Sequence, residues 1–272
     1  MQTRHGTIPA MSNRLALLTA IAVATSGIPL IAASAAAAAP CAFAPQGEGR
    51  VSAVIDARSF RLADGREVRL AGIEATFSDR PVPLQTQALA AMLMGRDVRL
   101  SGEDDTPDRY GRELAFVFLL PEEILVQREL LAQGETIASA DVADKDCAAA
   151  LTAAEGTARE AKRGIWADAA AIKNTESAGG ILAGIGRFML VEGKVLSVRQ
   201  AGATTYLNFG RSWTRDFAVT IPKSALANLT AAGLVPKSLE NKRVRVRGFV
   251  EARSGPRIEV LRAGQIELLG GE

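Results

Sequence analysis

The stretch Gly49–Phe77, GRVSAVIDARSFRLADGREVRLAGIEATF, decides the fold of the first half of the chain. Apolar and polar residues alternate along it, which is the period of a strand with one buried face. The Asp64-Gly65 pair interrupts the alternation and is typical of a tight hairpin turn. We therefore expect three strands here. Their polar face carries five charged residues: Asp56, Arg58, Arg61, Arg69 and Glu74.

The rest of the first half supplies the remaining elements of a small barrel. Residues 84–94 show apolar residues at helical spacing, residues 97–100 and 114–120 are typical of strands, and residues 125–132 and 147–163 of helices. Three strands, a helix, two strands and two helices predict a five-stranded barrel of the oligonucleotide-binding (OB) type with appended helices. The expected fold class is mainly β with helices (α+β).

The second half repeats this order. Residues 167–186 are rich in Ala, Gly and Ser and have no apolar period, so we predict a linker there, between a domain of residues 40–166 and one of residues 187–272. Three strands between residues 188 and 221, a helix over 222–232 and two strands between 244 and 261 predict a second, OB-like barrel. A β-sandwich is the alternative.

Residues 1–39 have the composition of a secretory signal peptide. Arg14 is followed by an apolar, Ala-rich run without charged residues, which ends in small residues suited to signal peptidase. We expect an exported protein, periplasmic or secreted, without a transmembrane span once this segment is removed. An uncleaved anchor helix is the alternative, although Gly27 and Pro29 interrupt the run.

Histidine and cysteine usage limits the chemistry. The single histidine, His5, lies in the predicted signal peptide, so the rest of the chain lacks Ser/His and Cys/His nucleophile pairs and histidine-ligated zinc. In an exported protein, Cys41 and Cys147 are expected to form a disulfide. A lipid-modified Cys41 is the alternative, but Ala39-Pro40 before it fits that modification poorly.

The charges are unevenly distributed between the halves. Residues 40–172 hold 15 basic and 22 acidic side chains, whereas residues 173–272 hold 15 basic and 8 acidic ones. A nucleic acid or another polyanion is therefore expected to contact the second half. Six residues there are the candidate binding residues: Arg243, Arg245 and Arg247 on one strand face, and Arg211, Trp213 and Arg215 in a predicted loop.

Each of these two groups has two interpretations. The alternating arginines predict a track for a phosphate backbone, or else a solvated barrel exterior. The indole of Trp213 between two arginines could stack on a base, or else pack on its own barrel.

Four motifs give residues 50–166 a resemblance to a known family. They are Val54-Ile55-Asp56, the run Val68-Arg69-Leu70-Ala71-Gly72-Ile73, the run Asp108-Arg109-Tyr110-Gly111-Arg112 before Leu114-Ala115, and Arg163-Gly164-Ile165-Trp166. In this order and spacing they resemble the staphylococcal nuclease (thermonuclease) family, in particular exported bacterial members with an additional C-terminal domain.

The resemblance implies hydrolysis of a phosphodiester by water with the help of Ca²⁺. In that family two carboxylates hold the metal, a glutamate positions or deprotonates the water, and two arginines stabilise the charge on the phosphate. Arg69 and Arg112 match the two arginines. Glu74 stands at one metal position, with Asp56 as a doubtful second ligand.

The chain departs from the family pattern at two positions. Arg58 stands where the family has the second metal-binding acid, and Phe77 stands at the position of the general base. The loss of a general base costs about 10²- to 10⁴-fold in rate, and a guanidinium beside a cation site repels Ca²⁺. We therefore expect a degraded catalytic site, that is, a pseudoenzyme.

Three alternatives concern this site. Asp56 or Asp79 could replace the missing ligand. Arg69 and Arg112 could pair with Glu74 and Asp56 as a structural ion cluster instead of binding phosphate. An acidic loop could hold a cation or be merely solvated; its carboxylates are Glu103, Asp104, Asp105 and Asp108.

The sequence thus favours an exported protein of thermonuclease type that binds single-stranded nucleic acid or another polyanion without efficient hydrolysis. One alternative is a weak calcium-dependent nuclease that uses Arg69, Arg112 and Glu74. The other is an envelope scaffold that binds a protein partner.

Overall fold

The structure is a computed structural model that describes residues 41, 43–75, 82–104 and 106–270. The predicted signal peptide and the side chains of Phe77, Asp79 and Asp105 lie outside the described residues. The segment from Ala38 to Glu272 forms one compact unit. Within the described ranges, no helix combines the length and the apolar character needed to cross a membrane.

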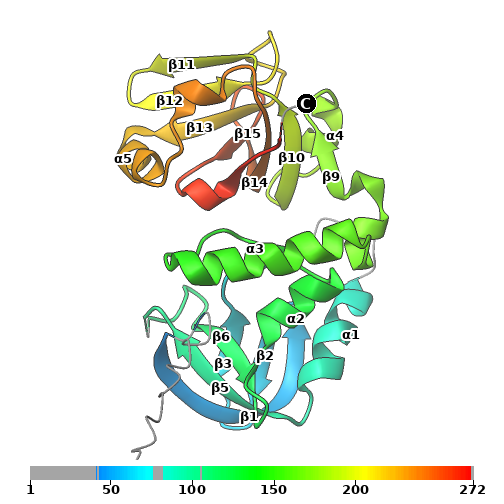
Figure 1. The fold of residues 1–272 in the computed structure, drawn as a ribbon. Helices are drawn as coiled ribbons and strands as arrows, with labels where there is room; N and C mark the ends of the chain where they lie inside the picture. The colour runs from blue at the N-terminus through cyan, green and yellow to red at the C-terminus, as the bar shows by residue number, and fades with distance from the viewer. Residues whose placement is uncertain (1–40, 42, 76–81, 105, 271–272) are drawn as a thin grey trace, which may run out of the picture. The chain divides into compact units, whose positions relative to one another are not determined.

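The first half of the described chain is a closed five-stranded barrel (Figure 1). Its strands are β1 (Ala44–Asp56), β2 (Ser59–Leu62), β3 (Glu67–Leu70), β5 (Asp97–Gly102) and β6 (Glu113–Leu119). They pair in the order β3-β2-β1-β5-β6, and a parallel pairing of β3 with β6 closes the ring. The long strand β1 makes this possible, because its first half pairs with β5 and its second half with β2. The predicted OB-type barrel and the α+β class are confirmed.

Three helices and three short strands complete this half. The helices are α1 (Val82–Leu93), α2 (Val126–Gln133) and α3 (Lys145–Glu160), and the strands are β4 (Ile73–Glu74), β7 (Ile124–Leu125) and β8 (Ile137–Ala138). The barrel core is apolar, with the side chains of Phe60, Leu70 and Phe118 almost completely buried. One buried polar group, Gln127 of α2, accepts a hydrogen bond from the Val117 amide and donates to two backbone carbonyls, which fixes α2 against β6.

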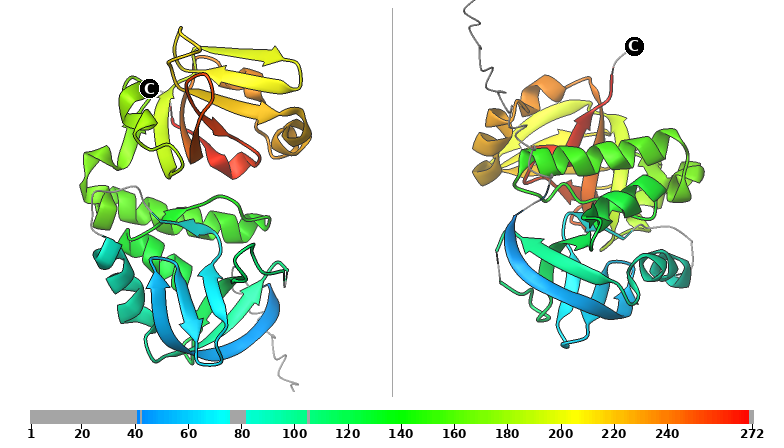
Figure 2. Two further views of the ribbon diagram at one scale, coloured as in Figure 1. Left: turned by 180° about the vertical axis from the view of Figure 1, so that it is seen from behind. Right: turned by 60° about the horizontal axis from the view of Figure 1, so that its bottom comes forward.

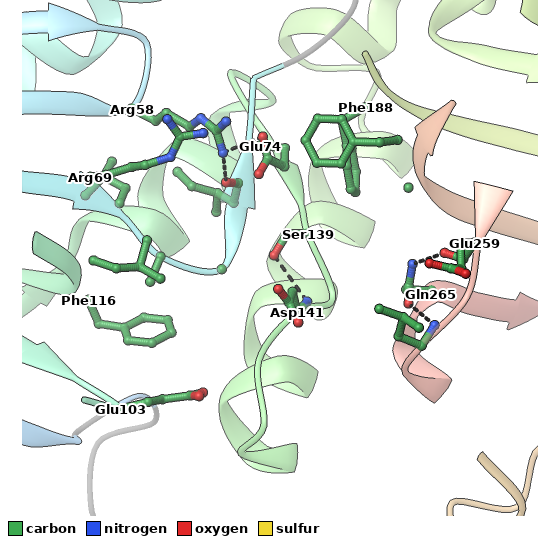
Figure 3. A pocket seen from close by; sticks show the side chains of 18 of the residues that line it. Arg58, Arg69, Glu74, Glu103, Phe116, Ser139, Asp141, Phe188, Glu259 and Gln265 are labelled. Atoms are coloured by element: carbon green, nitrogen blue, oxygen red, sulfur yellow. Dashed lines mark hydrogen bonds and ion pairs between the residues drawn. The ribbon is translucent and has the colours of Figure 1, made fainter. Parts of the chain in front are cut away.

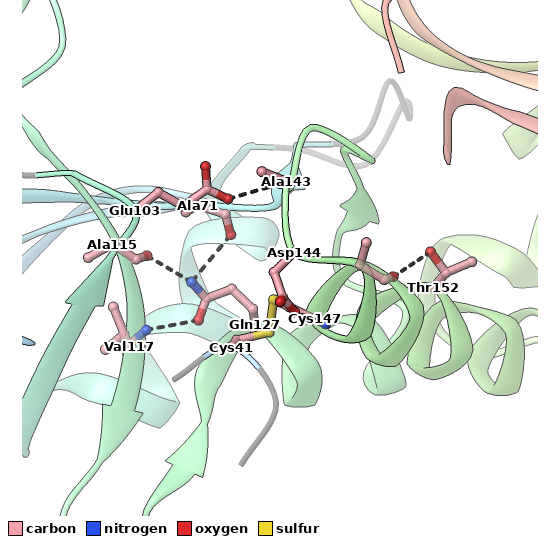
Figure 4. Close-up of a disulfide and its surroundings, with 11 residues drawn as sticks. Cys41, Ala71, Glu103, Ala115, Val117, Gln127, Ala143, Asp144, Cys147 and Thr152 are labelled. Atoms are coloured by element: carbon pink, nitrogen blue, oxygen red, sulfur yellow. Dashed lines mark hydrogen bonds between the residues drawn. A yellow bond between two sulfur atoms is a disulfide. The ribbon is translucent and has the colours of Figure 1, made fainter. Parts of the chain in front are cut away.

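A disulfide between Cys41 and Cys147 ties the start of this half to α3 (Figure 4). Cys147 lies in the first turn of α3, where its amide donates a 2.7 Å hydrogen bond to the carboxylate of Asp144, the N-cap residue. Both cysteines are buried. The structure thus contains the disulfide that the sequence suggested, and the lipid-modified Cys41 is not compatible with this pairing.

The second half of the chain has the same order of strand pairing. Its strands are β10 (Phe188–Lys194), β11 (Ser197–Ala201), β12 (Thr204–Asn208), β13 (Ala218–Pro222), β14 (Arg243–Ala252), β15 (Pro256–Glu259) and β16 (Ile266–Leu268), with helix α5 (Lys223–Ala231) between β13 and β14. Only two residues separate β10 from β11. This segment pairs with β14 at its first end and with β12 at its second end, as β1 pairs with β5 and β2. The parallel pairing of β13 with β15 corresponds to that of β3 with β6.

The segment predicted as a linker, residues 167–186, has structure of its own. It contains β9 (Ile172–Asn174), which pairs in parallel with β10, and the short helix α4 (Ala178–Leu182). Ile181 of α4 is buried in the core of the second half. The segment predicted as a linker therefore also extends the second sheet.

Helix α3 contributes to both halves (Figures 1 and 2). Leu151 packs into the first core, whereas Ala158 packs in a small apolar cluster with Trp166, Phe188 and Leu190. On the same helix, the carboxylate of Glu155 forms a bidentate ion pair with Arg247 of β14, at 2.9 and 3.0 Å. One helix thus links the two barrels through an apolar contact and a charged one.

Candidate functional site

A pocket of about 390 Å³ holds three of the residues that the sequence singled out on the first barrel (Figure 3). Arg58, from the turn between β1 and β2, lines it together with Arg69 of β3 and Glu74 of β4. The opposite wall comes from the second half of the chain and includes Phe188 and Phe249. The pocket is therefore shared by both barrels.

The turn between β3 and β4 places Glu74 in this pocket. Gly72 adopts a left-handed backbone conformation with φ of 73°, and a Cβ atom there would approach Leu151 to 2.8 Å. Glu74 then pairs with Ile137 in the two-stranded ladder of β4 and β8. The turn at Gly72 and the pairing of β4 with β8 thus fix the position of the Glu74 backbone.

Arg58 and Glu74 form an ion pair inside the pocket. Their side chains are only 13% and 14% exposed, and Arg58 also donates a 3.1 Å hydrogen bond from Nη1 to the carbonyl of Ile73. Asp56 does not join the pair; its Oδ1 accepts a 2.9 Å hydrogen bond from the backbone amide of Arg58. The guanidinium of Arg58 is therefore bound to the carboxylate of Glu74, which was the best candidate metal ligand.

The environment of Glu74 also changes its acidity. Burial raises the pKa of Glu74 above its ordinary value, and the nearby Arg58 guanidinium offsets part of that rise. The carboxylates of Asp141 and Asp56 add smaller increases to the pKa of Glu74. Burial outweighs the attraction of the arginine, so this carboxylate is easier to protonate than an exposed one.

The two arginines that match the family pattern lie in different surroundings. Arg69 lines the pocket, where Figure 3 shows its guanidinium beside that of Arg58. Arg112 lies in the loop before β6 and donates to the Asp108 carboxylate from Nε at 2.9 Å and Nη2 at 2.6 Å. This contact lowers the pKa of Asp108. The predicted cluster of Arg69 and Arg112 with Glu74 and Asp56 is therefore wrong for Arg112 and Glu74, since each has another partner.

Carboxylates outnumber arginines on the pocket wall. The acidic side chains are Glu74, Glu103, Asp104, Asp141, Glu251 and Glu259, against Arg58 and Arg69. Several of these acids have local partners: Glu103 accepts from the amide of Ala143 at 3.0 Å, and Asp141 pairs with Arg262 at 2.5 Å. Phe116, Phe188 and Phe249 supply an apolar surface in the same pocket. A phosphate backbone would meet net negative charge here.

The comparison with known families covers much of the first barrel and its helices. Residues 67–168 match the family model described as "Staphylococcal nuclease homologue". The chain contains a staphylococcal nuclease-like domain. No match was found among curated proteins. Arg69, Glu74 and Arg112 lie inside the matched residues of this domain, whereas the turn with Asp56 and Arg58 precedes them.

Proteins of the staphylococcal nuclease-like family usually depend on calcium, but the residues of this domain that the structure describes do not fit the ion. Calcium takes six to eight oxygen ligands, most of them carboxylates, carbonyls and water. Here the Glu74 carboxylate is bound to a guanidinium. Among the described residues, no group of three or more acidic, histidine or cysteine side chains is arranged to hold a metal.

The arginine strand of the second half does not form the predicted phosphate track. Arg245 and Arg247 are buried, at 9% and 2% exposure, and only Arg243 is exposed. Arg245 pairs with Glu192 and Glu267, and Arg247 with Glu155. Both interpretations of this strand, phosphate track and solvated exterior, are wrong for these two residues. Their acidic partners come from other elements, so the local alternation could not reveal them.

Trp213 is the most exposed large apolar side chain in the described chain. It is 72% exposed, and its neighbours Arg211 and Arg215 are exposed as well. The interpretation in which Trp213 packs on its own barrel is therefore wrong. In contrast, the other tryptophan, Trp166 of the nuclease-like domain, is 6% exposed.

Sequence reasoning missed the wall of the pocket that faces the nuclease-like domain. Phe188, Phe249, Glu251 and Glu259 lie far along the chain from Arg69 and Glu74, and no local motif marks them. The opposite charges of Arg58 and Glu74 were a signal in the sequence for their ion pair, but they gave no information about this wall.

Proposed function

We propose that this protein is an exported member of the thermonuclease type that binds single-stranded nucleic acid without efficient hydrolysis. The observation that carries the proposal is the ion pair between Arg58 and Glu74 in the pocket of the nuclease-like domain. The family membership of residues 67–168 supports nucleic acid as the ligand class.

The ion pair acts against metal-assisted hydrolysis in two ways. The Glu74 carboxylate, which would bind Ca²⁺, is already bound to Arg58. The guanidinium also places a positive charge where Ca²⁺ would have to enter. A bound metal contributes several kcal/mol of charge stabilisation in such reactions. Loss of that contribution alone would lower the rate by several orders of magnitude.

The charges of the pocket also bear on how a polyanion would bind. Arg69 could contact one phosphate, but the surrounding carboxylates oppose a longer backbone in the pocket. Contacts with an extended strand are therefore expected on exposed basic surface outside it. Export is supported by the buried disulfide, which is typical of proteins in oxidising compartments. A signal peptide over residues 1–39 and the division into domains of residues 40–166 and 187–272 belong to the same proposal.

Two measurements on one sample test the proposal. The purified protein is incubated with a fluorescently labelled oligo(dT), in Ca²⁺ and in EDTA, and both fluorescence anisotropy and strand cleavage are recorded. We expect affinity that falls as salt increases, with no cleavage that depends on Ca²⁺.

Two results would overturn it. EDTA-sensitive cleavage that disappears in Arg112→Ala and Glu74→Gln would establish the weak calcium-dependent nuclease instead. Absence of binding at low salt would remove nucleic acid as the ligand and favour the envelope scaffold. Arg50→Ala is the matched control, because Arg50 is an exposed arginine of β1 outside the pocket.

A further inference from the structure

The loop between β12 and β13 exposes a tryptophan among basic side chains. Trp213 is 72% exposed at the middle of residues 210–216, and Arg211 and Arg215 on either side are exposed. Exposure of a whole indole to water forgoes a large gain in burial energy. The side chain therefore does not serve the packing of its own barrel.

This loop is built to hold its shape. The carboxylate of Asp216 accepts a 2.7 Å hydrogen bond from the amide of Ser212, and the amides of Arg215 and Asp216 donate to the Ser212 carbonyl. Below the loop, Phe209 and Phe217 pack together with their ring centres 5.2 Å apart, and both are buried. The indole of Trp213 therefore extends from a loop that hydrogen bonds hold in shape and that adjoins two buried phenylalanine rings.

A second turn adds a third arginine beside the loop. Gly255, in the turn between β14 and β15, lies against Thr214 and Asp216, so close that a Cβ atom there would be 3.1 Å from the Asp216 carbonyl. Arg253 in the same turn is 72% exposed. Two acids lie nearby: Asp216 caps the loop, and Glu251 accepts from Arg257 at 3.1 Å and lies 3.9 Å from Nε of Arg253, so the arginines outnumber them. The surface around the indole is therefore basic.

We propose that this surface, formed by Trp213, Arg211, Arg215 and Arg253 and called the Trp213 surface below, is a binding site for single-stranded nucleic acid. One base stacks on the indole, and the arginines contact the flanking phosphates. An aromatic platform within a basic surface is the arrangement by which proteins bind single strands without sequence preference. The inference rests on the proposed function for its ligand, and it moves the main contact from the acidic pocket to the second barrel.

An anionic lipid surface is the other chemistry that such residues could meet. Insertion at a membrane surface needs a face of several apolar side chains. The residues next to the indole are Ser212 and Thr214, which are polar. The single exposed ring with polar neighbours favours a base over a lipid.

Tryptophan fluorescence and anisotropy with labelled oligo(dT) test the assignment. Binding should quench the emission of Trp213, whereas Trp166 is buried and should not respond. Trp213→Ala is expected to weaken binding about 5- to 150-fold, the range for loss of one stacked base. Trp213→Phe should keep most of the affinity without the quenching, and Arg211→Ala with Arg215→Ala should lower both affinity and its salt dependence.

The outcomes separate this inference from the proposed function. Unchanged affinity in Trp213→Ala, with an unchanged melting temperature, would overturn the Trp213 surface and leave nucleic acid as the ligand. A wild-type protein that binds no oligo(dT) at low salt would overturn both. Binding of phosphatidylglycerol vesicles in place of oligo(dT), with a shift of the Trp213 emission, would instead identify a lipid surface. Arg50→Ala is the matched control and should bind like wild type.

Discussion

The two barrels of this protein share one order of strand pairing but use their arginines differently. In the first, Arg58 and Arg69 lie on the wall of a pocket, and Arg58 pairs with Glu74 of β4. In the second, Arg245 and Arg247 are buried by acids from three other elements. Arg211 and Arg215, which flank Trp213 in the loop before β13, stay exposed.

The comparison teaches that a strand of alternating arginines does not by itself predict a binding surface. Arg247 is nearly inaccessible because α3 presents Glu155 opposite it. The tertiary partner, which can lie anywhere in the chain, decides whether a guanidinium is available to a ligand or used for structure.

The largest expected effect concerns the disulfide, which ties the start of the first barrel to α3. Because the bridge closes a loop with a sequence separation of 106 residues, its removal in the double variant C41S/C147S is expected to lower the free energy of unfolding by about 4 kcal/mol. Urea unfolding measures this. A loss below about 1 kcal/mol would contradict this expectation and show that the disulfide contributes little to stability.

The buried ion pair between the barrels should give the next largest effect. Glu155→Gln leaves the buried Arg247 guanidinium with only the more distant carboxylate of Glu267, at 3.8 Å, and loss of one partner of a buried pair typically costs about 3 to 5 kcal/mol. The double variant E155L/R247M should recover much of that loss, since apolar residues can replace a buried pair.

Urea unfolding of the single and double variants gives the coupling between the two positions. The exposed pair of Arg50 and Asp97 is the matched control, and its removal should cost less than about 1 kcal/mol. Equal costs for the two pairs would contradict the buried, structural role assigned to Arg247.

A smaller effect should appear in the pH dependence of stability. Because burial raises the pKa of Glu74 above 4.5, the native state binds more protons than the unfolded state between pH 4.5 and the raised pKa. The contribution of Glu74 is therefore complete below pH 4.5 and is lost as the pH rises through the raised pKa, at about 1.4 kcal/mol for each unit of the rise.

Urea unfolding between pH 4 and pH 8 measures this dependence. Glu74→Gln should flatten it above pH 4.5, whereas Glu122→Gln, at an exposed carboxylate, should not. Identical profiles for wild type and Glu74→Gln would show that the burial of Glu74 has no cost.

The smallest expected effect is the change in protein stability caused by a substitution at the Trp213 surface. Because the indole is exposed, Trp213→Ala should change the free energy of unfolding by less than about 0.5 kcal/mol. Trp166→Ala is the matched comparison in the first half and should cost about 3 to 5 kcal/mol, because that ring is buried. A large loss in Trp213→Ala would assign the residue to packing and remove the reason to see it as a ligand contact.

The sequence predicted the barrel because local signals determine it. Alternation over β1, β2 and β3, with the Asp64-Gly65 turn, was sufficient for the first barrel, and the repeated order of elements correctly indicated a β-rich second half. The site was only partly predictable. That Glu74 and Arg69 share a pocket followed from their strands, but the opposite wall with Phe188 and Phe249 depends on how α3 joins the barrels.

The same limit applies to the charged residues. The ion pair of Arg58 depends on the turn at Gly72, which brings Glu74 within reach. The ion pairs of Arg245 depend on acids that lie 22 and 53 residues away in the sequence. Periodicity reports which face a residue occupies, but not which distant charge will meet it.

Isothermal titration calorimetry of the wild-type protein with Ca²⁺ tests the central claim most directly. The claim is that Arg58 occupies the Glu74 carboxylate and so prevents cation binding in the nuclease-like domain. We predict no saturable binding of Ca²⁺, with the same result for Glu74→Gln. Saturable binding to the wild type that is lost in Glu74→Gln would contradict the claim.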